Sequence, residues 1–207
     1  MPAARPARTP RADNRLPLIL DEAARLFSAR GFHGTSIRDI VGAVDMLPGS
    51  LYYHFATKEA LLAAVYAEGV RRISEAVSAA IATRRDPWER LEAAAIAHLE
   101  ALLQESDYAQ VVIRVRPMDA PSVEGELVKL RDDYERLFVE LVQDLPLARG
   151  TDRRTLRLML LGALNWSQTW YVPPGREINA RGERRDGPRA IARRFVGLLR
   201  DQQLQPT

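Results

Sequence analysis

Apolar residues recur at intervals of three and four along most of the chain, the spacing that places side chains on one face of an α-helix. A first helix is predicted from about residue 13 to residue 30, where Ile19 and Phe27 share the buried side and Gly31 supplies the C-terminal stop. From residue 58 to residue 201 the same spacing predicts further helices and no strand. We therefore expect an all-α fold.

Two shorter helical segments follow the first one. Ser36 and Asp39 have the spacing of a capping box, which predicts a helix start. After a break over residues 42–47, Pro48 suits a first helical position, because its missing N–H would have no intrahelical partner there. Three short helices with a tight link before the third are the arrangement of a helix-turn-helix DNA-binding domain, which we place at residues 13–57.

The third segment, residues 47–55, is interpreted as the recognition helix of that domain. Leu51 and Phe55 lie four apart and share one face, which anchors the helix. The other side carries the polar aromatic residues Tyr52, Tyr53 and His54. Gly49 and Ser50 are small enough for the backbone to approach a phosphate or a base edge. The alternative is an ordinary core helix, which an isolated aromatic cluster would favour; the two preceding helices favour DNA binding.

The first third of the chain resembles the N-terminal domain of TetR-type transcriptional regulators. The resemblance rests on Gly31-Phe32, Thr35-Ser36-Ile37-Arg38-Asp39-Ile40, Gly49-Ser50-Leu51-Tyr52-Tyr53-His54-Phe55 and Lys58-Glu59. Two positions depart from the family pattern: Asp45 stands where glycine is usual, and Leu47 replaces a common serine or threonine cap. The resemblance implies a set of DNA-binding residues: Thr35, Ser36, Arg38, Pro48, Gly49, Ser50, Tyr52, Tyr53, His54 and Lys58.

The helices over residues 58–201 are expected to form a ligand-binding and dimerisation domain. Thr57 is placed to cap a long helix that runs from Lys58 to about Thr83. In the family resembled, the last two helices form a four-helix bundle with the same pair from a second subunit, which implies a homodimer. A twofold protein also suits paired half-sites in double-stranded DNA, since one two-turn helix covers few base pairs.

The ends of the chain lack helical periodicity. Residues 1–12 mix Pro, Ala and Arg, so we expect a flexible basic arm that is either a solvated tail or a contact for phosphates and the minor groove. The loop over residues 176–187 is rich in charge and glycine, and the tail at residues 202–207 is expected to fray.

Composition restricts the classes of function. The chain of 207 residues has no cysteine, which excludes disulfides, thiolate catalysis and cysteine-ligated zinc. Its three histidines lie far apart, and neither a glycine-rich phosphate loop nor a nucleophile elbow occurs, so we expect no metal site, no cofactor and no enzyme. No apolar run approaches the roughly 20 residues of a membrane-spanning helix, so we expect a cytoplasmic protein that does not bind membranes.

Two of the three tryptophans, Trp166 and Trp170, lie four residues apart in the segment 162–175. Tryptophans at this spacing belong more often to a core or a dimer interface than to a ligand site. The segment also resembles, more weakly, the acyl-coenzyme A-responsive subgroup of TetR-type regulators, which includes actinobacterial repressors of steroid and fatty-acid catabolism. That resemblance implies a pocket walled by both tryptophans, in which Asn165 orients a carbonyl or an amide.

An acyl-coenzyme A ligand also needs cations for its phosphates and adaptable packing around its acyl group. The further candidate ligand-binding residues are Arg114, Met118, Arg157 and Tyr171. For the arginines, the alternative is a solvated or ion-paired surface position.

The sequence thus predicts a homodimeric repressor that binds a palindromic operator when empty and is released by a small-molecule inducer, an acyl-coenzyme A thioester. One alternative keeps the fold but makes the pocket a general sensor of hydrophobic compounds. Another is a helical enzyme or carrier for acyl thioesters, which predicts turnover and no salt-sensitive DNA binding.

Overall fold

The structure of the protein, a computed structural model, describes residues 15–104, 106–172 and 186–204. All regular elements in these residues are helical, which confirms the all-α prediction. The predictions for the basic arm at residues 1–12, for most of the loop at 176–187 and for the end of the tail concern residues outside the described ones.

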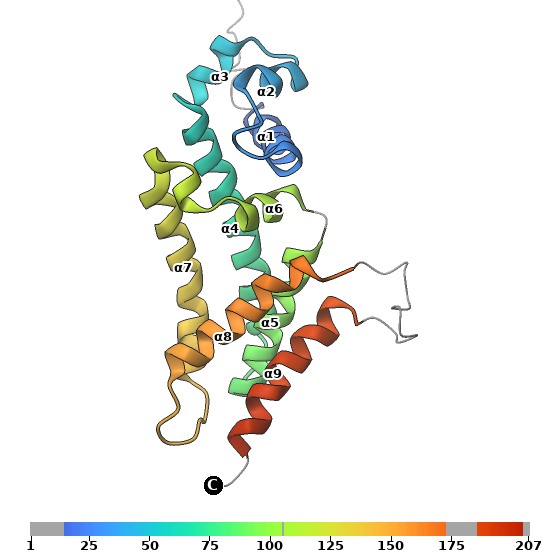
Figure 1. Ribbon diagram of the computed structural model, residues 1–207, viewed down its shortest axis with the longest axis vertical. Helices are drawn as coiled ribbons and strands as arrows, with labels where there is room; N and C mark the ends of the chain where they lie inside the picture. Colours follow the sequence, from blue (N-terminus) through green and yellow to red (C-terminus); the bar gives the residue numbers. More distant parts are fainter. Residues whose placement is uncertain (1–14, 105, 173–185, 205–207) are drawn as a thin grey trace, which may run out of the picture.

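The α-helices of these ranges are α1 (Leu16–Arg30), α2 (Ile37–Ala43), α3 (Pro48–His54), α4 (Lys58–Ile81), α5 (Pro87–Leu103), α6 (Asp107–Arg114), α7 (Glu124–Gln143), α8 (Arg153–Trp166) and α9 (Pro188–Leu204). Short 3₁₀ helices lie at Pro117–Asp119, Pro121–Val123 and Ser167–Thr169. Figure 1 shows an elongated molecule with α1, α2 and α3 at one end and α5, α8 and α9 toward the other. Within the described ranges, no helix combines the length and the apolar character needed to cross a bilayer.

Two hydrophobic cores lie along this elongated shape. The first joins α1, α2, α3, α6, the first half of α4 and the start of α7, with Leu51 and Leu62 fully buried in it. The second joins α5, α8, α9, the end of α4 and the second half of α7, with Phe138 and Leu164 fully buried in it. Because α4 and α7 contribute to both cores, they connect the two ends of the molecule.

The end of α8 differs from the sequence prediction. The spacing of apolar residues predicts one helix through to Tyr171, but α8 ends at Trp166 and a 3₁₀ helix follows. Two hydroxyl groups explain the change, because Ser167 Oγ donates to the carbonyl oxygen of Ala163 at 2.9 Å and Thr169 Oγ1 donates to that of Trp166 at 2.8 Å. Such bonds compete with the backbone pattern of an α-helix.

Close packing of α6 on α4 depends on Gly69. A Cβ atom at this position would lie 2.6 Å from Val112 Cγ2 and 2.9 Å from the carbonyl oxygen of Tyr108. We expect Gly69→Ala to lower the free energy of unfolding by about 1–3 kcal/mol, since overpacking exceeds the gain in helix propensity. Urea unfolding followed by circular dichroism measures the change.

Gly125 provides the matched control. It is an exposed residue in the first turn of α7, and a Cβ there would meet nothing within 4 Å. Gly125→Ala should therefore stabilise the protein by about 0.5–1 kcal/mol. Equal effects of the two substitutions would contradict close α4–α6 packing.

Candidate functional site

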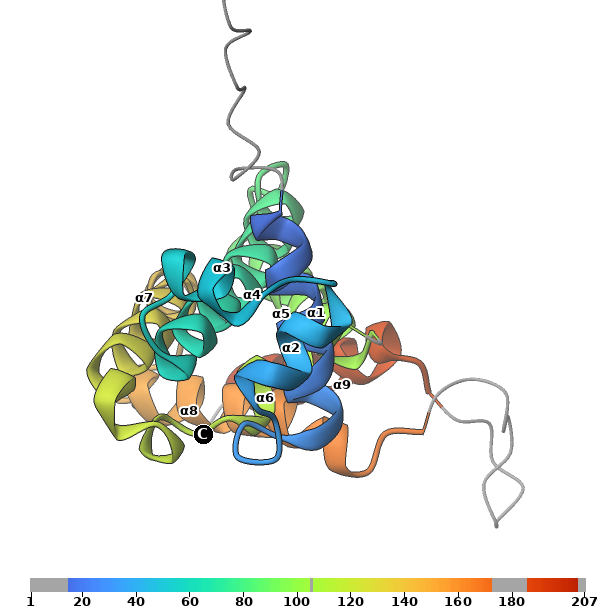
Figure 2. The ribbon, with the colours of Figure 1, turned by 90° about the horizontal axis from the view of Figure 1, so that it is seen from above.

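α3 is held to the protein by one side and exposes the other. Leu51 is fully buried, and Phe55 packs against the same core. Tyr53 is 81% exposed and Tyr52 is 52% exposed. In Figure 2, α2 and α3 lie at the end of the molecule nearest the viewer. The aromatic side of α3 therefore faces solvent, and the alternative of a core helix is wrong.

The link between α2 and α3 is a tight turn. Asp45 has a φ of 49°, the left-handed conformation that favours glycine and that aspartate tolerates better than most residues. The next residue, Met46, donates its backbone N–H to the carbonyl oxygen of Val41 at 2.9 Å. Asp45 thus adopts the backbone conformation that the turn needs, although the family usually has glycine there.

Most of the residues predicted to bind DNA have accessible side chains or backbone. The exposed ones are Ser36, Arg38, Pro48, Gly49, Ser50, Tyr52 and Tyr53, while His54 and Lys58 are half-buried. The hydroxyl of Ser36 is already engaged, because it donates to the Asp39 carboxylate at 2.5 Å and accepts the Asp39 backbone N–H at 3.2 Å. This capping box starts α2 as predicted, and the hydrogen bond from Ser36 lowers the pKa of Asp39.

The prediction of a phosphate contact by the Thr35 side chain is wrong. Thr35 is 1% exposed, and its hydroxyl points to the carbonyl oxygens of Gly31 at 2.9 Å and Leu26 at 3.2 Å. Leu26 lies near the end of α1, and Gly31 is the C-cap residue of that helix. Thr35 therefore fixes α2 to α1.

Lys58 has a structural contact beside its predicted role at DNA. Its ammonium group donates to the carbonyl oxygens of Phe32 and Thr35, each at 3.0 Å, and lies 4.2 Å from the centroid of the Phe32 ring. Two of its three donors are therefore used to tie the start of α4 to the turn between α1 and α2. A phosphate contact is limited to the remaining donor.

A cavity of about 170 Å³ lies where the two cores meet. Five α-helices and the 3₁₀ helix after α8 contribute to its wall. The lining residues are Tyr66, Val70, Ile73, His98, Leu102, Val112, Ile113, Arg131, Tyr134, Glu135, Leu161, Asn165 and Gln168. Most of these side chains are apolar or aromatic, with a few polar groups, which is the usual composition of a small-molecule site.

A chain of hydrogen bonds crosses this cavity wall from α7 through α5 to α8. His98 Nδ1 lies 2.5 Å from the Tyr134 hydroxyl, and His98 Nε2 lies 3.0 Å from Asn165 Oδ1. Since Asn165 Oδ1 only accepts, Nε2 carries the ring proton and Nδ1 accepts the proton of Tyr134. Burial lowers the pKa of His98 to about 4, so the ring is neutral at pH 7. This arrangement does not use the amide NH₂ of Asn165, a residue that lines the cavity.

Charged groups lie on the α7 and α8 side of the cavity. Glu135 accepts a hydrogen bond from Arg157 at 2.8 Å, and the side chain of Arg157 is only 15% exposed. Arg131 pairs with Asp132 at 3.1 Å, and its side chain is 47% exposed. Both arginines are therefore ion-paired, since Arg131 also lies 3.8 Å from Glu135, but Arg131 is the one that solvent reaches.

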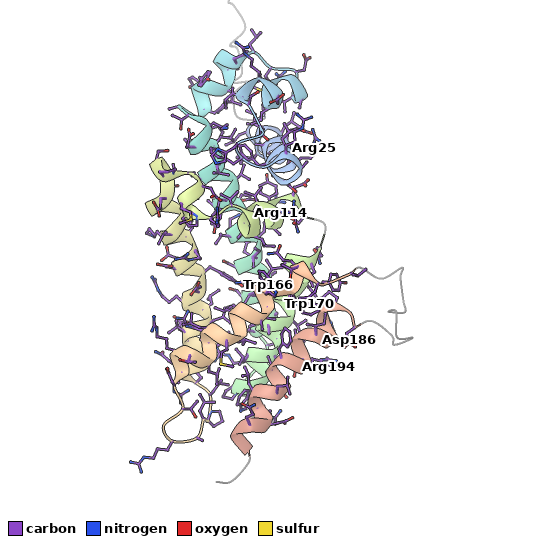
Figure 3. The ribbon with its side chains drawn as sticks, viewed as in Figure 1. Arg25, Arg114, Trp166, Trp170, Asp186 and Arg194 are labelled. Carbon is purple, nitrogen blue, oxygen red and sulfur yellow. The ribbon has the colours of Figure 1, made fainter. Side chains whose placement is uncertain are left out.

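Of the seven residues predicted to bind a ligand, Asn165 lines this cavity and the other six do not. Trp166 is 67% exposed and Trp170 is 49% exposed, so the structure places both on the outer surface, as labelled in Figure 3. They lie outside the wall because α8 turns its Leu161–Asn165 side inward and because Trp170 follows the end of that helix. Met118 is 63% exposed, and Tyr171 packs against the second core.

Arg114 takes a different role from the one predicted. Its guanidinium donates to the carbonyl oxygen of Ser28 on α1 at 3.1 Å, and Figure 3 shows it beside the helices of the first core. Six residues earlier on α6, the Tyr108 hydroxyl donates to Asp21 on α1 at 2.8 Å. α6 is thus tied to α1 at both of its ends, and Val112 and Ile113 between them line the cavity.

The sequence contained one signal for this cavity that the prediction did not use. His98 lies on the apolar face of α5 with Leu91 and Leu102, and a polar residue on a buried face requires a hydrogen-bond partner. Tyr134 and Arg131 had no such signal, since they lie in a charged helix. Among the described residues, no group of three or more His, Asp or Glu side chains is arranged to hold a metal ion.

Comparison with known proteins connects this geometry to a family. Residues 19–65 match the model of bacterial regulatory proteins of the tetR family, and residues 84–202 match the model of the tetracyclin repressor-like C-terminal domain. The HTH-type transcriptional repressor KstR2 of Mycolicibacterium smegmatis is 31% identical over 167 residues, which cover 76% of this chain and 79% of that protein.

Solved structures show the same fold. AibR, in complex with isovaleryl coenzyme A and operator DNA, is 26% identical with a TM-score of 0.72 over 89% of this chain and 97% of its own. KstR2 of Mycobacterium tuberculosis is 18% identical with a TM-score of 0.70 over 94% of this chain and 97% of its own, which shows the fold alone. The second family model covers more than half of the chain, and so the chain belongs to the tetR family of bacterial transcriptional regulators and not to a family of enzymes.

Proposed function

We propose that the protein is a homodimeric repressor that binds a palindromic operator when its cavity is empty and releases it when an acyl-coenzyme A thioester binds. The observation that carries the proposal is the position of the cavity, which touches α4, a helix of both cores, and α6, which is hydrogen-bonded to α1 at the DNA-binding end. AibR, a relative of the same fold, was solved with both isovaleryl coenzyme A and operator DNA.

The size of the cavity supports a small acyl group. Its volume of about 170 Å³ is close to the roughly 150 Å³ that accommodates a benzene molecule and below the roughly 300–1,000 Å³ of sites for drug-sized ligands. An acyl group of about six to eight heavy atoms fits this volume. The coenzyme A moiety would lie outside, toward the exposed side of the wall, where a phosphate would compete with Asp132 and Glu135 for the half-exposed Arg131.

The polar wall supports recognition of an uncharged carbonyl group. His98 is neutral and holds the amide oxygen of Asn165, so the Asn165 NH₂ is the donor available to an acyl carbonyl. Asn165 is itself exposed at the edge of the cavity, which places this donor near the opening. A thioester carbonyl between the buried acyl group and the exterior coenzyme A suits that position.

The contacts of α4 and α6 supply a route to the DNA-binding end. A ligand that displaces Val112 and Ile113 moves α6, which carries the Tyr108 and Arg114 hydrogen bonds to α1. Movement of α4 is passed to the turn before α2 through Lys58. The ligand must bind this displaced conformation more tightly than the DNA-binding one, since otherwise it would not shift the equilibrium.

A homodimer is supported by an apolar surface on the last two helices. The exposed apolar residues there are Leu158, Met159, Trp166 and Leu198, and Trp170 just after α8 is exposed as well. Large apolar side chains that are exposed on neighbouring helices are typical of a protein interface when they gather in one patch. An interface here also agrees with the alternative stated for Trp166 and Trp170, which was a dimer interface instead of a ligand pocket.

The proposal predicts selective release of operator DNA. With an operator defined by footprinting, isovaleryl coenzyme A should lower the affinity of the protein for DNA by roughly 5–150-fold, the usual range of allosteric coupling. Free coenzyme A and a thioester with a multi-ring acyl group should have little effect, because one lacks the acyl group and the other exceeds the cavity. Fluorescence anisotropy with labelled operator measures the affinities.

An Asn165→Ala variant tests the site within the same experiment. It should bind operator like the natural protein but need roughly tenfold more thioester for release, the effect of one lost hydrogen bond. Release by unrelated hydrophobic dyes and not by thioesters would instead support a general sensor of hydrophobic compounds. Operator binding that no thioester alters would refute the effector assignment and leave the DNA-binding function standing.

A further inference from the structure

Leu47 is an exposed apolar residue at the start of the recognition helix. It occupies the N-cap position of α3, and its side chain is 76% exposed. It provides no side-chain hydrogen bond to the helix, whereas Ser36 and Thr57 cap the neighbouring helices α2 and α4 with their hydroxyl groups. A serine or threonine at this position would stabilise α3, so the stability of the free protein does not account for leucine.

The surroundings of Leu47 place it on the outward side of the helix-turn-helix unit. Met46 before it packs against the first core, and Leu51 one turn later is fully buried. The residues directly after it, Pro48, Gly49 and Ser50, are all exposed. Leu47 therefore adjoins the surface that the tetR family relationship assigns to DNA, and its apolar side chain projects from a stretch of small residues.

In the major groove, base edges offer donors and acceptors together with one apolar group, the C5-methyl group of thymine. A leucine side chain has no polar atom, so this methyl group is the base feature that it can distinguish. We propose that Leu47 contacts the methyl group of a thymine in each half-site of the operator and selects thymine at that position. The proposal rests on operator binding and is independent of the effector.

Deoxyuridine provides a direct test, because it lacks the methyl group but keeps the hydrogen-bonding edge of thymine. In the footprinted operator, each thymine is replaced by deoxyuridine at symmetric positions of both half-sites. At one position per half-site, the replacement should lower the affinity of the natural protein roughly tenfold, the amount that two buried methyl groups supply. Replacement at the other thymines should change the affinity less than about twofold.

The Leu47→Ala variant should bind the thymine operator and that deoxyuridine operator equally well. Leu47→Ser serves as a second variant, since its hydroxyl can cap α3 and the variant should melt at the same or a higher temperature. Arg38→Ala is the control: it should weaken binding to both operators by the same factor and keep the discrimination between them.

Two results would overturn the assignment of Leu47. One is an operator in which no deoxyuridine replacement lowers the affinity of the natural protein; the other is a methyl effect of the same size in Leu47→Ala and Leu47→Ser. A protein that binds no DNA would refute the proposed function as well, and footprinting before the replacements distinguishes that failure from the first two.

Discussion

Replacing Trp166 by arginine is expected to give a folded monomer that binds a palindromic operator about 10²–10⁴-fold more weakly than the natural protein. Trp166 is 67% exposed on α8, with Met159 two turns earlier 61% exposed and Leu198 on α9 63% exposed. In a twofold interface, an arginine here would bring two like charges into an apolar contact. A dimer binds two linked half-sites at once, whereas a monomer binds one half-site. The expected loss in affinity is the avidity that the second recognition helix supplies.

Sedimentation equilibrium and operator binding by fluorescence anisotropy together measure this effect. The variant should retain the far-UV circular dichroism of the natural protein, because the substituted side chain lies outside both cores. Ser78→Arg, at an exposed position of α4, adds the same charge and should change neither property. A Trp166→Arg protein that stays dimeric, or a natural protein that is already a monomer, would contradict the proposed interface.

Acid is expected to destabilise the protein through His98. Burial lowers the pKa of this residue to about 4, against 6.5 for an exposed histidine. Between these values the unfolded chain binds a proton at His98 and the folded chain does not, so stability is fully present above about pH 6.5 and is lost as the pH falls toward 4. The difference of 2.5 pKa units corresponds to roughly 3 kcal/mol.

A His98→Gln variant isolates this contribution. Glutamine has a donor and an acceptor but does not titrate, so the stability of the variant should fall less between pH 6.5 and pH 4 than that of the natural protein. Urea unfolding at a series of pH values measures both slopes. Carboxylates with a lowered pKa, such as Glu68 and Asp133, also make the protein less stable in acid. Both proteins contain them, so their contributions cancel in the comparison. Identical slopes would mean that His98 is solvated or charged in the folded state.

The helix-turn-helix domain could be predicted from the sequence because its signals are local. Helix starts and stops depend on residues a few positions apart, as in the capping box of Ser36 and Asp39 and the stop at Gly31. The turn at Asp45 and the missing side-chain cap at Leu47 were also visible, since each concerns one backbone position. The exception is Thr35, whose hydroxyl partners lie on another helix.

The candidate ligand site was predicted far less well. Trp166 and Trp170 are conspicuous in the sequence, but large aromatic side chains serve interfaces and pockets alike, and helical spacing does not say which face meets which neighbour. Tyr134 and Arg131 lie in a helix dense with charges, where they have no distinguishing feature. Asn165 was named from the resemblance to acyl-coenzyme A-responsive regulators, but its partner His98, 67 positions away, was not.

The sequence alone determined the all-α class and, apart from the end of α8, where the main helices lie, since both follow from periodicity and capping within short segments. The outward aromatic side of α3 was inferred from the two helices that precede it. The tertiary structure decided what lies at the junction of the two cores. Hydrogen bonds among Tyr134, His98 and Asn165 join α7, α5 and α8 there. Arg157 pairs with Glu135, and Arg114 donates a hydrogen bond to α1. These contacts depend on how helices distant in the chain pack together, and no local pattern specifies that packing.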